Sequence, residues 1–266
     1  MDRLLTKSQS STPAPSASAQ ARVLYVAGHL SQRQCDFEQA RKQYMASLSL
    51  YRQLEDTRQI AVVLRGLGEI AQDEGDQTSA KNYYEQSLDL FRSLSDLKGI
   101  SIALGHLAIL AFLQGDYERA ATLCKETLAI GRERDNNRTT AISLTTLGFA
   151  SWGIGEFKYA ETEFSEALAL QAELTDKRVA QYSLLGMGLI ALALSQPVRA
   201  AKLLGAADSL REQLGTPLPP SQLHQYDLQV TFLHGYLDET AFATAWAEGR
   251  AMTLEQAVEF ALKESE

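Results

Sequence analysis

Several short motifs in this sequence have the residue types of cofactor or catalytic sites. Gly66-Leu-Gly68-Glu-Ile-Ala71 and Gly186-Met-Gly188-Leu-Ile-Ala191 fit the loose dinucleotide-binding pattern G-x-G-x-x-[GA]. That chemistry requires a strand and a tight turn that place the pyrophosphate at a helix N-terminus. Both copies instead fall in the middle of predicted helices, at equivalent positions of a repeat. We therefore interpret them as helix-packing glycines.

The other candidate motifs lack the companions that their chemistry needs. Ser95-Asp-Leu-Lys98 fits S-x-x-K but lies in a predicted turn without the accompanying motifs. No phosphate loop of the form G-x-x-x-x-G-K-[ST] occurs. The histidines have no metal-ligand spacing; they are His29, His106, His224 and His234. The acids of one predicted helix are expected to form a solvated face; they are Glu161, Glu163 and Glu166. The sequence predicts no catalytic residue, metal site or cofactor.

Composition narrows the class of protein further. The chain has 266 residues, of which 45% are hydrophobic and 22% charged, and its net charge of −8 argues against nucleic-acid binding. Two cysteines, Cys35 and Cys124, form no disulfide framework, which favours a cytoplasmic location. Apolar runs are too short to span a membrane. Residues 16–196 contain no proline, which favours long helices.

Internal repetition with a period of forty residues determines the predicted architecture. Five kinds of position recur in phase: Ala40, Ala80, Ala120, Ala160, Ala200; Leu24, Leu64, Leu104, Leu144, Leu184; Gly28, Gly68, Ala108, Gly148, Gly188; Tyr44, Tyr84, Cys124, Phe164, Leu204; and Ser47, Ser87, Thr127, Ala167, Ala207. Cys124 therefore belongs to the predicted core, and Cys35 replaces a turn glycine.

Each unit is predicted to be an antiparallel helix pair. Leu64, Leu67, Gly68 and Ala71 follow the spacing of one helix face. A break follows at Gly75-Asp76 and at its equivalents, where glycine ends one helix and the acid caps the next. The equivalents are Cys35-Asp36, Gly115-Asp116 and Gly155-Glu156. Small residues let the two helices approach closely, and bulky residues fill the space beside them.

This pattern resembles the tetratricopeptide repeat, although the period is forty residues rather than thirty-four. The resemblance covers residues 21–215 and rests on Leu67-Gly68, Gly75-Asp76, Ala80, Tyr84 and Ser87 and their equivalents. It implies an all-α, right-handed superhelix of five pairs, at about 21–56, 57–96, 97–136, 137–176 and 177–215.

The two ends are predicted to differ from the repeats. Residues 1–20 are interpreted as the remnant of an earlier helix and a flexible linker, as if the chain began inside a longer array. Residues 216–266 are expected to form a helical cap, with helices near 221–235, 238–248 and 253–264. Thr253 and Gln256 have the spacing of a capping box.

A second resemblance concerns the C-terminal third. Residues 199–207, 210–212, 215–220, 242–250 and 252–258 are similar to the end of large bacterial regulators that combine a STAND-type ATPase, a repeat arm and often a LuxR-type DNA-binding domain. That resemblance implies a non-catalytic sensor or scaffold arm. The alternative is a free-standing adaptor in a multiprotein assembly.

The tetratricopeptide resemblance also implies which residues line the concave groove. The predicted binding residues are Tyr25, His29, Arg65, Glu69, Gln72, Phe112, Phe149, Trp152 and Leu189. Further lining residues are Arg22, Gln32, Ile109, Thr145, Leu185 and Leu192. The lining changes from polar to apolar along the array, and exposed apolar surface usually has a partner. The expected occupant is a protein or peptide, a small inducer, or the chain's own residues 221–266.

Overall fold

A computed structural model describes residues 16–215 and 230–263, and these residues form helices without strands. Ten helices make five pairs: α1 (Ala17–Arg33), α2 (Phe37–Gln53), α3 (Thr57–Asp73), α4 (Gln77–Ser93), α5 (Leu97–Leu113), α6 (Tyr117–Glu133), α7 (Asn137–Ile154), α8 (Phe157–Leu174), α9 (Lys177–Ala193) and α10 (Pro197–Gln213). Residues 230–234 are helical, and α12 (Glu239–Arg250) and α13 (Leu254–Leu262) follow. The all-α repeat prediction is confirmed.

Turn chemistry recurs at the helix boundaries. Asp36, Asp76 and Asp116 precede the second helix of their pairs, and each side chain accepts a hydrogen bond from the backbone N–H three residues later. The preceding residue has a positive φ, which glycine supplies at Gly75 and which Cys35 adopts at the first break. Glu156 makes no such bond, so the predicted cap is wrong at this break. Asp and Asn are the usual side chains at this position, and glutamate carries an additional methylene.

The repeated alanines lie in the packed interior of the helix pairs. Ala40, Ala80, Ala120, Ala160 and Ala200 are fully buried. A bulky side chain from the second helix lies over the small residue of the first helix, and a Cβ added to Gly68 would come within 2.6 Å of the Tyr84 ring. Gly148 meets Phe164 in the same way, at 2.8 Å. The predicted role of these glycines in helix packing is confirmed.

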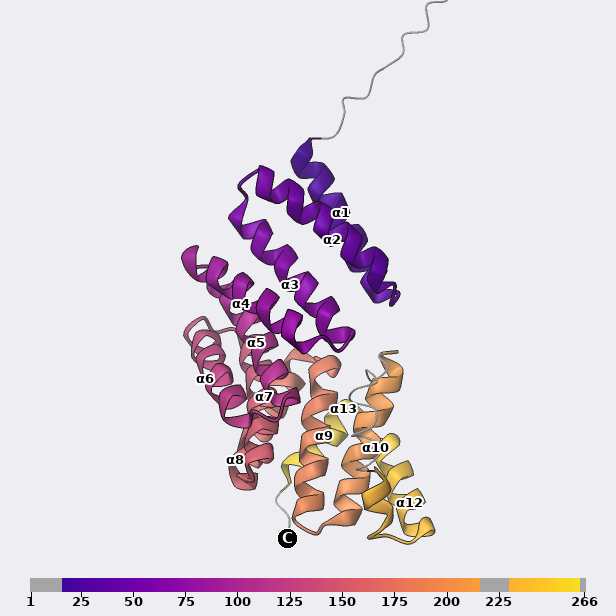
Figure 1. The fold of residues 1–266 in the computed structure, drawn as a ribbon. Helices are drawn as coiled ribbons and strands as arrows, with labels where there is room; N and C mark the ends of the chain where they lie inside the picture. Colours follow the sequence, from indigo (N-terminus) through magenta and orange to yellow (C-terminus); the bar gives the residue numbers. More distant parts are fainter. Residues whose placement is uncertain (1–15, 216–229, 264–266) are drawn as a thin grey trace, which may run out of the picture.

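The helix pairs stack into a curved array (Figure 1). The first helices of neighbouring pairs, α1, α3, α5, α7 and α9, contact one another along the row. The second helices are joined by ion pairs on the other side, such as Arg92–Glu126 at 2.9 Å and Arg132–Glu166 at 2.7 Å. These pairs are exposed, so each contributes little to stability. The first helices therefore line the inner side of the array.

The C-terminal helices continue the hydrophobic core of the last two pairs. The core that contains Phe164 and Leu204 also contains Leu233, Ala245, and Val258 of α13. The α12 helix lies against α10, and α13 contacts α8, α9 and α10 (Figure 1). Thr253 and Gln256 form the predicted capping box.

The α10–α12 contact brings two backbones unusually close. A Cβ on Gly205 would lie 2.5 Å from the Trp246 carbonyl oxygen, and one on Gly249 would clash with the Lys202 carbonyl. Arg250 extends this contact with ion pairs to Asp208 and Glu212, each at 2.5 Å. The cap is therefore fixed to the last repeat by backbone proximity as well as by charge.

The structure departs from the predicted N-terminal linker. The first helix begins at Ala17 with Ser16 as its cap, so residues 17–20 are helical where a flexible linker is expected. Residues 1–15 and most of the predicted helix 221–235 lie outside the described residues. Within the described part of the chain, no helix is both long and apolar enough to cross a membrane.

Candidate binding surface

Three positions of each first helix define the predicted inner surface. They are the equivalents of Tyr25, His29 and Gln32 at intervals of forty residues. His29 is exposed, and most of the others are half-buried: Tyr25, Arg65, Glu69, Gln72, Ile109, Phe112, Phe149, Trp152, Leu185 and Leu192. Half-buried side chains in one row are positioned by their neighbours and still present atoms to solvent. We call this row the inner surface.

Two predicted members do not belong to the inner surface. Leu189 is 4% exposed and lies in the core of the last repeats, and Thr145 is 5% exposed. Thr145, Gln171 and Ser183 form a buried hydrogen-bonded triad. Gln171 donates to the hydroxyls of both Thr145 and Ser183, at 3.1 Å each. The Thr145 and Ser183 hydroxyls are 2.8 Å apart. The helices of the last repeats pack closely enough to cover these two positions, which corrects the prediction.

The polar end of the inner surface is an ion-pair cluster. Arg65 and Glu69 pair within α3, and Nε2 of His106 lies 3.2 Å from the Glu69 carboxylate. Burial works against the charge of Glu69, but the hydrogen bond and charge of His106, with Arg65 and His29, lower its pKa to about 2. Arg65 also bonds Tyr25, whose pKa is raised mainly by burial. The cluster holds Glu69 as a carboxylate.

Glutamines at this end bond the tyrosines of the core. The Tyr44 hydroxyl donates to Gln32 at 3.2 Å, and the Tyr84 hydroxyl donates to Gln72 at 3.1 Å. Gln32 also donates to Asp73 at 3.3 Å. Tyr44 and Tyr84 thus each have a hydrogen-bond partner at the inner surface, as a buried hydroxyl requires. The predicted residue Gln72 is held in place by the core.

Aromatic rings dominate the other half of the inner surface, which we call the apolar or aromatic half, whereas the half around the ion-pair cluster is the polar half. The ring centroids of Phe112 and Phe149 are 5.8 Å apart. Phe149 makes an edge-to-face contact with the buried Phe164, with ring centroids 5.0 Å apart. Tyr117 lies 5.5 Å from Phe112. Trp152 packs against the core of the last repeats and remains half-buried. This half offers apolar area and ring faces to a ligand.

Sequence reasoning missed two kinds of residue on α5 and α7. His106 lies one position beyond the predicted column, so strict spacing by forty overlooks it. Ile102 and Ile142 are each 37% exposed and occupy equivalent positions three residues before the first predicted column. The equivalent residue in α1 is Arg22, and the sequence prediction includes this position only in the first repeat. The signal was available, because residues three apart share a helix face.

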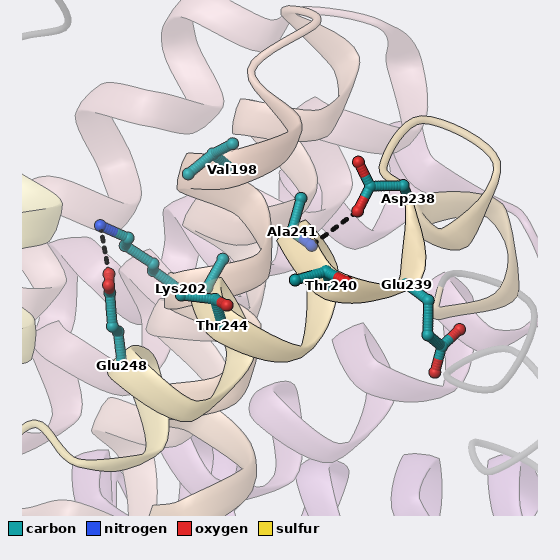
Figure 2. A pocket seen from close by; sticks show the side chains of 9 residues that line it. Val198, Lys202, Asp238, Glu239, Thr240, Ala241, Thr244 and Glu248 are labelled. Atoms are coloured by element: carbon teal, nitrogen blue, oxygen red, sulfur yellow. Dashed lines mark hydrogen bonds and ion pairs between the residues drawn. The ribbon is translucent and has the colours of Figure 1, made fainter.

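A depression separate from the inner surface lies between the last repeat and the cap. It has a volume of about 750 Å³ and lies between α10 and α12. Figure 2 shows that its charged groups serve local structure: Lys202 pairs with Glu248 at 2.6 Å, and Asp238 accepts a bond from the Ala241 N–H at 2.9 Å. Glu239 lies apart from the others. These groups do not converge as a catalytic set would.

The other chemical candidates are structural. Gly66 and Gly188 lie inside helices, where a dinucleotide fingerprint has no turn to form. Cys124 is buried, and burial raises the pKa of its thiol to about 12. Among the described residues, no group of His, Cys, Asp and Glu has the geometry to hold a metal ion.

The fold and the inner surface define a class: a helical-repeat solenoid that presents a graded row of side chains. The family model of the tetratricopeptide repeat matches residues 19–93 and 99–173, which is more than half of the chain. The chain belongs to this family, as its sequence resemblance predicts. A comparison with curated proteins gives no significant match.

Similar solved structures share the fold at low sequence identity. The apo form of RapI is 15% identical, with a TM-score of 0.63 over 90% of this chain and 97% of RapI. NprR in complex with its cognate peptide NprX is 17% identical, with a TM-score of 0.58 over 89% of this chain and 67% of NprR. The Rap conjugation gene regulator of plasmid pLS20, in complex with the Phr* peptide, is 12% identical, with a TM-score of 0.63 over 100% of this chain and 83% of that one.

Proposed function

We propose that this chain is a non-catalytic binding module that holds a peptide, or a peptide segment of a partner protein, on its inner surface. The observation that carries the proposal is the gradient along that surface. An ion-pair cluster around Arg65 and Glu69 is followed by half-buried rings at Phe112, Phe149 and Trp152. A peptide suits both halves, because its polar end can be oriented by charge while an apolar side chain contacts the rings.

The structural relatives support a peptide over a small inducer. NprR and the pLS20 regulator share the fold and were solved with the peptides NprX and Phr*. Their identity to this chain is too low to transfer individual residues, so the support concerns the kind of ligand. A half-buried row that spans several first helices also suits an extended ligand better than a compact one.

We further propose that the module serves as the sensor or scaffold arm of a larger cytoplasmic regulator. The similarity of residues 199–258 to the ends of STAND-ATPase and LuxR-type regulators motivates this step. A reading frame that continues upstream of Met1 into a phosphate loop and a DNA-binding domain supports the regulator. An in-frame stop upstream supports the free-standing adaptor instead.

Direct nucleic-acid binding is not part of the proposal, because the net charge is −8 and phosphate contacts need a basic face. A titration with duplex DNA at low salt tests this point. Binding that weakens steeply with added salt would contradict it.

Selection from a displayed random-heptapeptide library tests the binding function. The enriched peptides are synthesised with a fluorophore and titrated with the protein by anisotropy. We expect Trp152→Ala to lower the affinity by about tenfold or more, since a half-buried aromatic is a typical anchor. Tyr159→Ala is the matched control, because Tyr159 is an aromatic on α8 that is 66% exposed. If no peptide is enriched, or if both variants bind as the wild type does, the proposal fails.

A further inference from the structure

Glycine residues in this chain have structural explanations, with one exception on the inner surface. The turn glycines adopt a positive φ; they are Gly75, Gly115, Gly155 and Gly215. A Cβ added to any of a second group would press on a neighbouring group; these are Gly28, Gly66, Gly68, Gly99, Gly131, Gly148, Gly153, Gly186, Gly188, Gly205, Gly235 and Gly249. Gly105 belongs to neither group. It has no positive φ, and a Cβ there would meet nothing within 4 Å.

Gly105 lies in the middle of α5, where glycine is unfavourable. A helix is less stable when glycine replaces alanine in its interior, because the unfolded glycine backbone has more freedom. Neither packing nor turn geometry offsets this cost at Gly105. Fold stability therefore gives no reason for a glycine at this position.

The position itself belongs to the inner surface. Its equivalents in the other first helices are Tyr25, Arg65, Thr145 and Leu185. These are larger side chains, so α5 is the one first helix that leaves this position open. The open position lies between the ion-pair cluster, which includes the adjacent His106, and the aromatic half that begins at Phe112.

The surroundings of Gly105 along α5 are apolar. Ile102 and Ile109 lie three residues before and four residues after it, on the same face of the helix. Ile102 is 37% exposed and Ile109 is half-buried. A group that enters the open space contacts the Gly105 backbone between two isoleucine side chains. A bulky apolar group fits these surroundings best, because it removes their surface from water.

We propose that Gly105 is a specificity-determining residue of the peptide site, and that a branched or aromatic side chain of the bound peptide rests on its backbone between Ile102 and Ile109. The inference rests on the proposed peptide-binding function and adds to it the place and the chemistry of one contact. The absence of a Cβ is then what admits the ligand side chain. A side chain on residue 105 would occupy the same space.

Substitutions at residue 105 separate this role from a structural one. The probe is the fluorescent heptapeptide of highest affinity enriched on the wild-type protein. Gly105→Ala adds one methyl group. We expect it to raise the melting temperature by about 2 °C and to lower the affinity for the peptide by threefold or more. Gly105→Leu fills the space, and we expect it to lower the affinity for the peptide at least twentyfold without lowering the melting temperature.

A matched control adds the same bulk on the outer side. Ala129 is an exposed residue of the second helix α6, so Ala129→Leu should leave both affinity and melting temperature unchanged. Replacing each apolar residue of the peptide by alanine identifies the side chain involved. When alanine replaces the peptide side chain that rests on Gly105, the wild-type protein and Gly105→Leu should bind that peptide with nearly equal affinity.

The outcomes distinguish the two proposals. If the peptide loses affinity on Trp152→Ala but binds Gly105→Leu as tightly as wild type, the Gly105 inference is wrong and the binding function stands. If no peptide is enriched, both fall. If Gly105→Ala lowers the melting temperature, the glycine has a structural role and the inference is also wrong. In ¹⁵N-labelled protein, peptide addition should shift the Gly105 amide resonance, and an unmoved resonance would overturn the contact.

Discussion

The two halves of the inner surface are built on two different cores. In the first two pairs, Tyr44 and Tyr84 are fully buried, and their hydroxyls donate to Gln32 and Gln72 at the inner surface. In the later pairs the equivalent core residues have no hydroxyl; they are Cys124, Phe164 and Leu204. The residues in the glutamine position are then apolar; they are Phe112, Trp152 and Leu192.

This difference links the residues of the core to the polarity of the inner surface. A buried hydroxyl needs a partner, so a tyrosine in the core favours a glutamine on the inner surface. A core phenylalanine has no such need and leaves the surface position free for an aromatic ring. The gradient of the inner surface is therefore coupled to the choice of core residue in each repeat.

The largest expected effect concerns the apolar half. Phe164 is fully buried and contacts Phe149, Gly148 and Gly186. Phe164→Ala should cost about 3–5 kcal/mol of unfolding free energy, because it leaves a cavity in the core. Thermal unfolding followed by circular dichroism measures it. The exposed Tyr159→Ala on the same helix should change stability by less than about 0.5 kcal/mol, and equal effects would contradict this account of the core.

The next effect concerns charge in the polar half. Glu69→Gln removes the negative charge that pairs with Arg65 and His106, and should cost roughly 1–3 kcal/mol at neutral pH. A carboxylate whose pKa is lowered from 4.5 to about 2 stabilises the fold above pH 4.5, and this contribution is lost as pH falls towards 2. The stability of Glu69→Gln should therefore fall less over that range than the stability of the wild type.

The exposed pair Glu38–Lys42 provides the control for charge. Its side chains are 81% and 66% exposed, so Glu38→Gln should have little effect. A similar loss in both variants would show that the cluster around Glu69 contributes no more than a surface pair. Asp73, Tyr25 and Tyr84 also interact with this cluster, so the full pH profile should be compared between variants.

Much of this fold could be predicted because equivalent positions in successive repeats carry the same kind of residue. Five alanines in phase predict five buried positions, and Gly75-Asp76 predicts a turn; the structure has both. The inner surface was harder, because exposure depends on how neighbouring pairs pack. Leu189 and Thr145 have the correct spacing but are buried. Gly105 carries no side chain, so its openness became visible only with the surrounding atoms in place.

A smaller effect tests the coupling between core and surface directly. Tyr84→Phe removes the donor to Gln72 and should cost about 1 kcal/mol. The double variant Tyr84→Phe with Gln72→Leu recreates the apolar combination of the later pairs. It should recover part of the loss, giving a coupling energy of about 0.5 kcal/mol or more in a double-mutant cycle. Strictly additive effects would mean that the two positions are independent.

The smallest expected effect concerns an acid of the later helix pairs. Glu163 on α8 is half-buried, and its Oε2 atom is buried without a hydrogen-bond partner. Burial raises its pKa, in spite of the hydrogen bond from Ser151 and the charge of Lys125. The pKa of Glu163 therefore shifts in the opposite direction to that of Glu69, which neighbouring groups hold in its charged form.

The comparison between these two acids predicts that one neutral substitution stabilises the protein. With a raised pKa, the folded state holds the Glu163 proton to a higher pH than the unfolded state does. Stability is then lost as pH rises from 4.5 through the raised pKa. Glu163→Gln removes the buried charge and should gain about 0.5–1 kcal/mol at pH 7, with little change at pH 4. Thermal unfolding at both pH values measures this. A loss of stability at pH 7 would show that the carboxylate is as well accommodated as that of Glu69.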